Sequence, residues 1–157
     1  MHFSTAVIAS VAALLPMASA VGNAIVKNNC ANTVYLWSVG SSVGAMQTIA
    51  PGKKYSEVLR HDAVSGGIAL KITTSSNGLY DGSAQTNFAY TLDGSLVWYD
   101  LSDVFGDPFS GHGLAVDPSV ATCPDIWWSN GVSPSGSQTH DCTSAASVTL
   151  TLCATKA

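Results

Sequence analysis

The most informative part of the chain is residues 87–109, which read NFAYTLDGSLVWYDLSDVFGDPF. In its first half, bulky apolar residues alternate with smaller ones, which is the period of a β-strand with one buried face. The bulky residues are Phe88, Tyr90 and Leu92. Asp93-Gly94 follows and tolerates the positive φ angles of a tight turn, after which the apolar residues 96–99 return the chain. The pattern therefore predicts a β-hairpin that leads into an acidic loop.

The same stretch holds four of the ten acidic residues of the chain. These are Asp93, Asp100, Asp103 and Asp107. A glycosidase needs one protonated and one ionised carboxyl group, about 5 Å apart for retention or about 6.5–9.5 Å apart for inversion. The candidate catalytic pair is Asp100 with Asp103 or Asp107. Asp100 and Asp103 are three residues apart, and residues at that spacing on a strand point to opposite faces. We therefore expect Asp103 and Asp107 to have a structural role, in which they accept turn hydrogen bonds from the backbone.

Short β-type segments separated by turn-forming residues lie on both sides of this hairpin. They fall at residues 23–28, 33–39, 46–51, 55–59, 68–73, 113–116 and 147–152. No segment of residues 21–157 shows the sustained 3.6-residue apolar repeat of a helix. About eight short strands at this spacing predict an all-β fold, either a sandwich or a barrel.

Residues 1–20 are expected to be a secretory signal peptide. The apolar run Ala6–Leu15 precedes the small-residue motif Ala18-Ser19-Ala20, after which the mature chain would begin at Val21. This run is too short to span a bilayer, and the alternative is an uncleaved amphipathic helix. Residues 21–157 have the size of one domain, which we expect to be secreted to the extracellular space or the cell wall.

The chain carries a formal net charge of −4 at pH 7, and only 10% of its residues are charged. Binding to nucleic acid or to an anionic membrane requires clustered Lys and Arg, so neither partner is expected. Ser, Thr, Asn and Gly supply the polar surface in place of charges. This composition favours a secreted β-protein.

The chain has four cysteines, which after a signal peptide predict two disulfides. Four cysteines permit three pairings. Cys30 follows the first expected strand and Cys153 follows the last. Cys123 and Cys142 bracket one loop. We therefore expect the pairs Cys30–Cys153 and Cys123–Cys142. Zinc binding is the alternative, but the sequence contains no CxxC pair.

Two adjacent tryptophans, Trp127 and Trp128, lie in a segment at residues 119–146 that is rich in Ser, Thr, Gly and Pro. Exposed indoles stack on sugar rings. With Asp125 and Tyr80, this pair forms the candidate ligand-binding set.

A structural role for the same aromatic residues is the alternative. One tryptophan of the pair would then pack over the Cys123–Cys142 disulfide and the other would lie in the core, where large aromatic residues dominate burial. Trp98 and Tyr35 are expected to lie in the core.

No metal and no cofactor are expected. His61, His112 and His140 are isolated along the sequence and are not spaced as metal ligands. The G-x-S-x-G signature of a hydrolase nucleophile is absent. Paired cysteines leave no free thiol for catalysis.

Several segments occur in a characteristic order. They are IVKNNCANTVYLWSV (25–39), TIAPGKKYSE (48–57), GGIALKI (66–72), residues 85–109 and VTLTLC (148–153). This order resembles the fungal yeast-phase-specific secreted protein family, a small branch of the thaumatin-like proteins. The resemblance covers most of residues 23–153 and implies a thaumatin-like antiparallel β-sandwich. In thaumatin-like proteins the cysteine after the first strand pairs with the one that closes the last, as Cys30 and Cys153 would here.

The resemblance also implies which residues occupy the family's acidic cleft, which larger members line with one Arg, one Glu and three Asp. Asp100 matches one of the Asp positions. The Glu position corresponds to Ala89, and the next Asp position corresponds to Phe105. The resemblance therefore supports the fold more strongly than a cleft activity.

Together with these observations, the resemblance implies a secreted fungal thaumatin-like protein that contacts cell-wall glycan, such as β-glucan, or a host component, without catalysis. One alternative is a weak β-1,3-glucanase of the acidic-cleft type. The other is an effector or antigen that acts through protein contacts. Exposed coplanar aromatic residues would indicate glycan binding, and two carboxyl groups facing one groove would indicate the enzyme. An apolar patch without either would indicate protein contacts.

Overall fold

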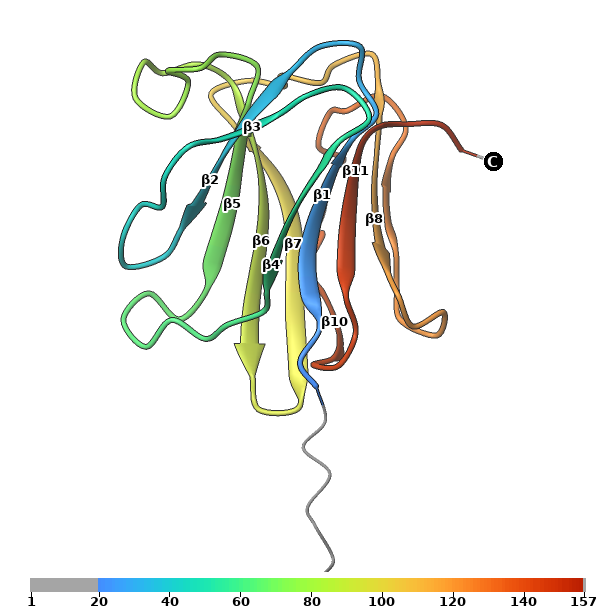
Figure 1. Ribbon diagram of the computed structural model, residues 1–157. Coiled ribbons are helices and arrows are strands. Elements are labelled where there is room, and N and C mark those ends of the chain that lie inside the picture. Colours follow the sequence, from blue (N-terminus) through green and yellow to red (C-terminus); the bar gives the residue numbers. More distant parts are fainter. Residues whose placement is uncertain (1–19, 157) are drawn as a thin grey trace, which may run out of the picture.

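The computed structural model describes residues 20–156. The signal peptide expected at residues 1–20 lies outside this range except for Ala20. The described residues form eleven strands and no helix (Figure 1). In chain order the strands are β1 (Asn23–Asn28), β2 (Val34–Val39), β3 (Gln47–Ile49), β4 (Lys54–Val58), β5 (Ile68–Thr73), β6 (Gln85–Asp93), β7 (Leu96–Val104), β8 (Gly113–Pro118), β9 (Ile126–Trp128), β10 (His140–Thr143) and β11 (Val148–Ala154).

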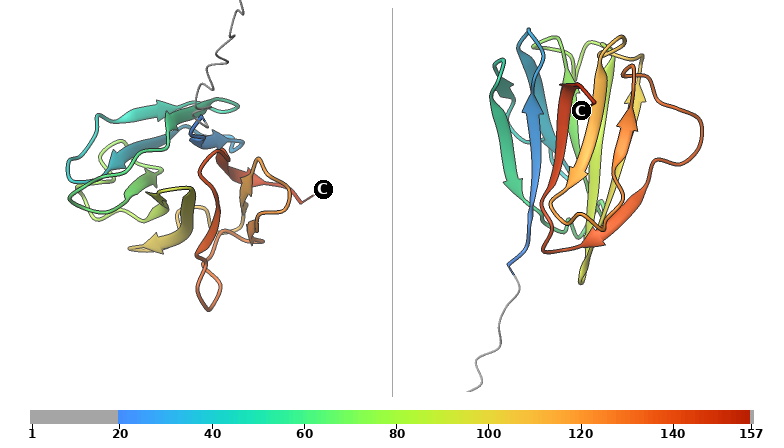
Figure 2. Two further views of the ribbon diagram at one scale, coloured as in Figure 1. Left: turned by 90° about the horizontal axis from the view of Figure 1, so that it is seen from below. Right: turned by 90° about the vertical axis from the view of Figure 1, so that its right-hand side faces the viewer.

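The strands form two sheets that pack face to face (Figures 1 and 2). The five-stranded sheet has the order β4-β1-β11-β8-β9, and the six-stranded sheet has the order β10-β7-β6-β5-β2-β3. The right-hand view of Figure 2 looks onto the five-stranded sheet, where the blue β1 and the red β11 lie side by side. The predicted all-β sandwich is therefore confirmed.

The central hairpin consists of β6 and β7. Its turn lies one residue later than the sequence pattern suggests, because Asp93 pairs with Leu96 and the two turn residues are Gly94 and Ser95. Gly94 has a φ angle of 57°. Glycine at the first central position is typical of a type II′ turn, whose twist matches that of the flanking strands. The hairpin prediction is confirmed, and its Asp93-Gly94 turn is corrected to Gly94-Ser95.

The first and last strands meet in the five-stranded sheet, where β1 pairs with β11 in parallel. The other pairings among the described strands are antiparallel. A parallel pair needs a long crossover connection. Here the chain between β1 and β11 supplies that crossover, because it passes through the six-stranded sheet before it returns. The antiparallel β-sandwich expected from the sequence therefore includes one parallel pair.

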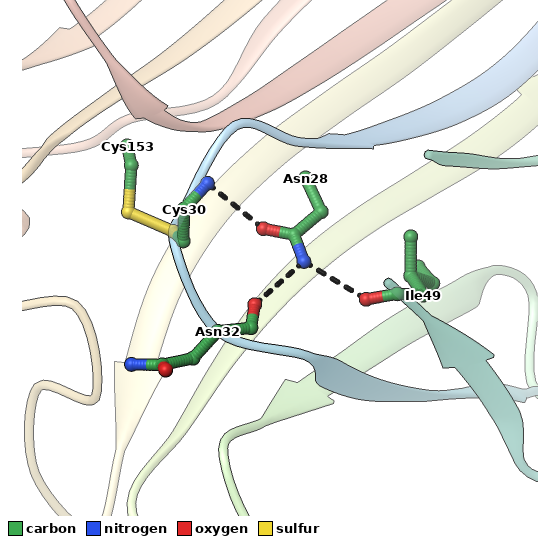
Figure 3. Close-up of a disulfide and its surroundings, with 5 residues drawn as sticks. All are labelled: Asn28, Cys30, Asn32, Ile49 and Cys153. Atoms are coloured by element: carbon green, nitrogen blue, oxygen red, sulfur yellow. Dashed lines mark hydrogen bonds between the residues drawn. A yellow bond between two sulfur atoms is a disulfide. The ribbon is translucent and has the colours of Figure 1, made fainter. Parts of the chain in front are cut away.

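Two disulfides, Cys30–Cys153 and Cys123–Cys142, join segments of the sandwich. Both predicted pairings are therefore confirmed. The turn that carries Cys30 is held by the fully buried side chain of Asn28 (Figure 3). Oδ1 of Asn28 accepts a hydrogen bond from the backbone amide of Cys30 at 3.0 Å. Its Nδ2 donates to the carbonyl oxygens of Asn32 at 2.9 Å and Ile49 at 2.8 Å.

The core lies between the sheets and takes the inward-facing residues of both. In β7, alternation places Val97, Tyr99 and Leu101 in the core. Trp98 therefore points outward and is 40% exposed, so the expectation that it lies in the core is wrong. The same alternation in β2 turns Tyr35 outward, where it is only partly buried, which corrects the second core expectation.

The segment 119–146, in which no strand is expected from the sequence, contains β9 and β10. β9 forms one edge of the five-stranded sheet, and β10 forms one edge of the six-stranded sheet. These strands are three and four residues long, too short to show an alternating pattern. The described chain therefore has more strands than the sequence pattern reveals.

Candidate functional site

The acidic residues of the central hairpin do not converge on one site. Asp93 ends β6 beside the turn, whereas Asp103 lies near the far end of β7, roughly 20 Å away along the strands. Asp100 lies on the outward side of β7, together with Trp98. Asp103 lies on the inward side, opposite the buried Thr86. Asp100 and Asp103 therefore face opposite sides of the sheet and do not form a glycosidase pair.

Asp103 interacts with Thr86 and not with the backbone of its own loop. Oγ1 of Thr86 donates to Oδ1 of Asp103 at 2.5 Å. Oδ2 of Asp103 is buried and has no hydrogen-bond partner within residues 20–156. Burial raises the pKa of Asp103 to about 6, the Thr86 hydrogen bond lowers it, and the neighbouring Asp107 raises it. The prediction that Asp103 accepts turn hydrogen bonds from the backbone is wrong, because its side chain points into the sandwich.

A shallow groove crosses the outer face of the six-stranded sheet. Ala69 of β5 and Ala89 of β6 pair directly with each other and form its floor. Their small side chains leave a hollow of about 450 Å³. A second hollow, of about 90 Å³, extends from Ala89 to Trp98, Asp100 and Thr139. Both hollows include Ala89, so they adjoin on this face, and we call the two together the outer-sheet groove.

One end of the outer-sheet groove combines an aromatic ring with polar groups. The exposed Trp98 precedes Asp100 by two residues on the same side of β7. The hydroxyl of Thr139 donates to Oδ1 of Asp100 at 3.1 Å, which fixes the carboxylate. Oδ1 of Asn87, two residues before Ala89 on β6, is buried without a hydrogen-bond partner among the described residues, and Asn87 lines neither hollow. An indole ring beside a carboxylate is suited to the apolar face and hydroxyl groups of a sugar.

The sequence singled out Asp100, but Trp98 was assigned to the core. The alternation in β7 is the signal that could have revealed Trp98, because its neighbours Val97 and Tyr99 are the better core residues. Nothing in the local sequence indicates the contribution of Thr139, which comes from a segment 39 residues away along the chain.

The four residues predicted to bind a ligand lie in three different places. Trp127 and Asp125 line one cavity of about 270 Å³ on the outer face of the five-stranded sheet. Trp128 is in the core, with 1% of its surface exposed. Tyr80 lies between β5 and β6 and packs edge-on against Trp37, with ring centroids 6.3 Å apart. The predicted aromatic set is therefore not formed as a unit, because neighbouring residues on β9 point to opposite sides.

No group of three or more His, Cys, Asp and Glu side chains within residues 20–156 is arranged to hold a metal ion. His61, His112 and His140 all lie in this range. The same described range contains no helix of the length and apolar character needed to cross a membrane.

Comparison with known proteins identifies relatives over nearly the whole chain. A family model described as Blastomyces yeast-phase-specific protein (Bys1) matches residues 11–154. An antigenic thaumatin-like protein of Arthroderma benhamiae is 37% identical over 169 residues, which cover 98% of this chain and 85% of that protein. The secreted thaumatin-like protein calA of Emericella nidulans is 30% identical over 164 residues, which cover 95% of this chain and 94% of that protein.

A solved structure supports the same relationship. The protein elicitor MoHrip2 from Magnaporthe oryzae superposes with a TM-score of 0.70 at 28% sequence identity, over 85% of this chain and 99% of that chain. Fold, disulfides and relatives together define a thaumatin-like protein of the fungal type. The chain belongs to the Blastomyces yeast-phase-specific protein family, and the resemblance inferred from its sequence is confirmed.

Proposed function

We propose that this protein is secreted and binds a cell-wall glycan, such as β-1,3-glucan, in the outer-sheet groove without cleaving it. One observation carries the proposal: the exposed indole of Trp98 and the carboxylate of Asp100 share one side of β7 beside a hollow floored by alanines. A sugar ring stacks on the indole, and its hydroxyls donate to the carboxylate of Asp100.

The groove favours binding over hydrolysis. Ala89 lies directly opposite Asp100 in the register of β6 and β7, so the neighbouring strand offers no second carboxylate at that level. Asp141 of β10 pairs with Trp98 and lies on the same outer face. It does not line either hollow of the groove. These positions argue against two carboxyl groups flanking one glycosidic bond inside the groove.

Secretion is supported by two independent features. The relative calA of Emericella nidulans is described as secreted. Disulfides persist in oxidising compartments, and this chain has two. We therefore place the protein outside the cell, in the medium or in the cell wall, after removal of a signal peptide at residues 1–20.

Co-sedimentation with insoluble polysaccharides tests the glycan proposal. Purified mature protein is mixed with particulate β-1,3-glucan or with chitin, and the bound fraction is measured in the pellet. We expect wild-type protein to bind β-1,3-glucan and Trp98→Ala to weaken binding about tenfold, because the stacking surface is lost. Trp127→Ala is the matched control, since it removes an indole from the opposite outer face. Binding to chitin alone would retain the outer-sheet groove as the binding site and would identify chitin, in place of β-1,3-glucan, as its ligand.

Two results would contradict this function. Equal binding by wild type and Trp98→Ala would exclude the groove as the binding site. If the protein bound neither polysaccharide, binding to these cell-wall glycans would be excluded and protein contacts would be the better explanation of its function.

Hydrolysis is tested in the same preparation. Soluble β-1,3-glucan is incubated with the protein, and the release of reducing sugar is measured. We expect none above the buffer blank. Release that is abolished by Asp100→Asn and also by Asp141→Asn would instead establish a weak glucanase, with those two residues as its carboxylates.

A protein-contact function is the second candidate, and an exposed aromatic residue favours it. Phe105 is 70% exposed in the loop after β7 and adopts a φ angle of 63°, which a bulky residue rarely takes. Val104 beside it is also exposed. The neighbour MoHrip2 is described as a protein elicitor. A host-cell response that is lost in Phe105→Ser, while glycan binding is unchanged, would support this candidate.

A further inference from the structure

A second cavity lies on the opposite outer face, that of the five-stranded sheet. β8 and β9 pair with Ala115 opposite Trp127. If the register of β8 and β9 is extended by two residues from this pair, Asp117 lies beside Asp125. Because side chains alternate along a strand, all four side chains point outward. They line a cavity of about 270 Å³ together with Lys156, and we call it the Trp127 cavity.

The indole of Trp127 is a fixed wall of this cavity. A Cβ atom at Gly113 would lie 2.7 Å from Cη2 of Trp127, so the ring occupies space that only a glycine leaves free. The face of the ring is already used by a cation. Nζ of Lys156 lies 5.9 Å from the ring centroid, which is the geometry of a cation–π interaction.

The charges that line the Trp127 cavity are not balanced. Asp117 and Asp125 place like charges side by side on adjacent strands, which destabilises a sheet. Partial burial, and then the negative charge of Asp125, raise the pKa of Asp117. Lys156 supplies one positive charge against these two carboxylates. The cavity therefore attracts a further cation.

We propose that the Trp127 cavity binds the side-chain ammonium of a lysine from a partner protein, in exchange for Lys156. Lys156 itself demonstrates that a lysine side chain reaches the indole from an extended segment. β9 is the edge strand of its sheet, so a partner segment can lie alongside it and present such a side chain. The outer-sheet groove lies on the other sheet, and the two sites are therefore free to act independently.

The test uses mature protein and a small probe, Nα-acetyl-L-lysine methylamide, with binding followed by the indole N–H resonance of Trp127. The corresponding norleucine amide is the matched neutral control, because it has the same apolar side-chain length without the ammonium. We expect saturable binding of the lysine probe at low ionic strength and its weakening by added salt. Lys156→Ala should tighten binding about fivefold, because the competing cation is removed.

Further variants locate the interaction. In the Lys156→Ala background, Trp127→Ala should abolish binding and Asp117→Asn should weaken it severalfold. Lys71→Ala removes a lysine from β5 of the other sheet with the same change in net charge, and it should leave the affinity unchanged. Equal binding of the norleucine amide, or no saturable binding by Lys156→Ala, would overturn the proposal. Tighter binding of glucosamine than of the lysine probe would assign the cavity to an amino sugar instead.

Discussion

Asp100 and Asp103 lie three residues apart on β7 and face opposite sides of the six-stranded sheet. Asp100 reaches the outer-sheet groove, where Thr139 holds its carboxylate. Asp103 points inward, where Thr86 holds it and where burial opposes its ionisation. One acidic sequence segment thus contributes a carboxylate to the outer-sheet groove and a second, half-buried carboxyl group that faces the inside of the sandwich.

Asp103→Asn should stabilise the protein at neutral pH. The folded pKa of Asp103, about 6, lies above its ordinary value of 3.8. The protonated carboxyl group of Asp103 therefore makes its full contribution to the free energy of unfolding below about pH 4, and this contribution is lost as the pH rises through about 6. The amide stays neutral and still accepts from Thr86. We expect the free energy of unfolding at pH 7 to rise by about 1–2 kcal/mol, after allowance for solvent screening.

Urea unfolding at pH 4 and pH 7 measures this effect. The decrease in stability between the two pH values should be smaller in Asp103→Asn than in wild type. Asp100→Asn is the control, since that carboxylate lies on the outer face. A variant less stable than wild type at pH 7 would contradict the raised pKa.

Asn28→Ala should destabilise the sandwich strongly. The Asn28 side chain is fully buried and makes three hydrogen bonds to the backbone at Cys30, Asn32 and Ile49 (Figure 3). Truncation leaves buried backbone groups without partners, at a cost of about 2–4 kcal/mol. Chemical denaturation checks this value, with the exposed neighbour Asn29→Ala as the matched control. Similar stabilities for the two variants would show that Asn28 does not hold the turn.

Removing the two disulfides should have unequal effects. Cys30 and Cys153 are separated by 123 residues, whereas Cys123 and Cys142 are separated by 19. In the chain-entropy model the longer loop contributes about 5 kcal/mol and the shorter about 3 kcal/mol. We expect the Cys30→Ala/Cys153→Ala variant to have the lower melting temperature in calorimetry. A lower melting temperature for Cys123→Ala/Cys142→Ala would show that native-state contacts outweigh chain entropy here.

The fold was largely predictable because its strongest signals are local. Alternation in β5, β6, β7 and β11 marks the strands with one buried face, and the positions of the cysteines give the correct pairing. The parallel pairing of β1 with β11 and the short strands β9 and β10 were not predictable. They depend on contacts between segments far apart in the chain, which local patterns do not record.

The candidate site was less predictable for the same physical reason. Trp127 and Trp128 are adjacent in sequence, yet strand geometry sends one to a surface cavity and the other to the core. Trp98 looks like a core residue by composition, but the alternation of its own strand exposes it. The outer-sheet groove arises because two alanines meet across β5 and β6, a relationship that exists only once the register is set.

The most direct test of the account is a titration of the mature protein with a soluble β-1,3-gluco-oligosaccharide, followed by the four tryptophan indole N–H resonances. These come from Trp37, Trp98, Trp127 and Trp128, which lie in different environments. We predict a saturable shift of the Trp98 resonance, with the Trp127 and Trp128 resonances unchanged, and the loss of binding in Trp98→Ala. A shift confined to Trp127, or no shift at saturating oligosaccharide, would contradict glycan binding in the outer-sheet groove.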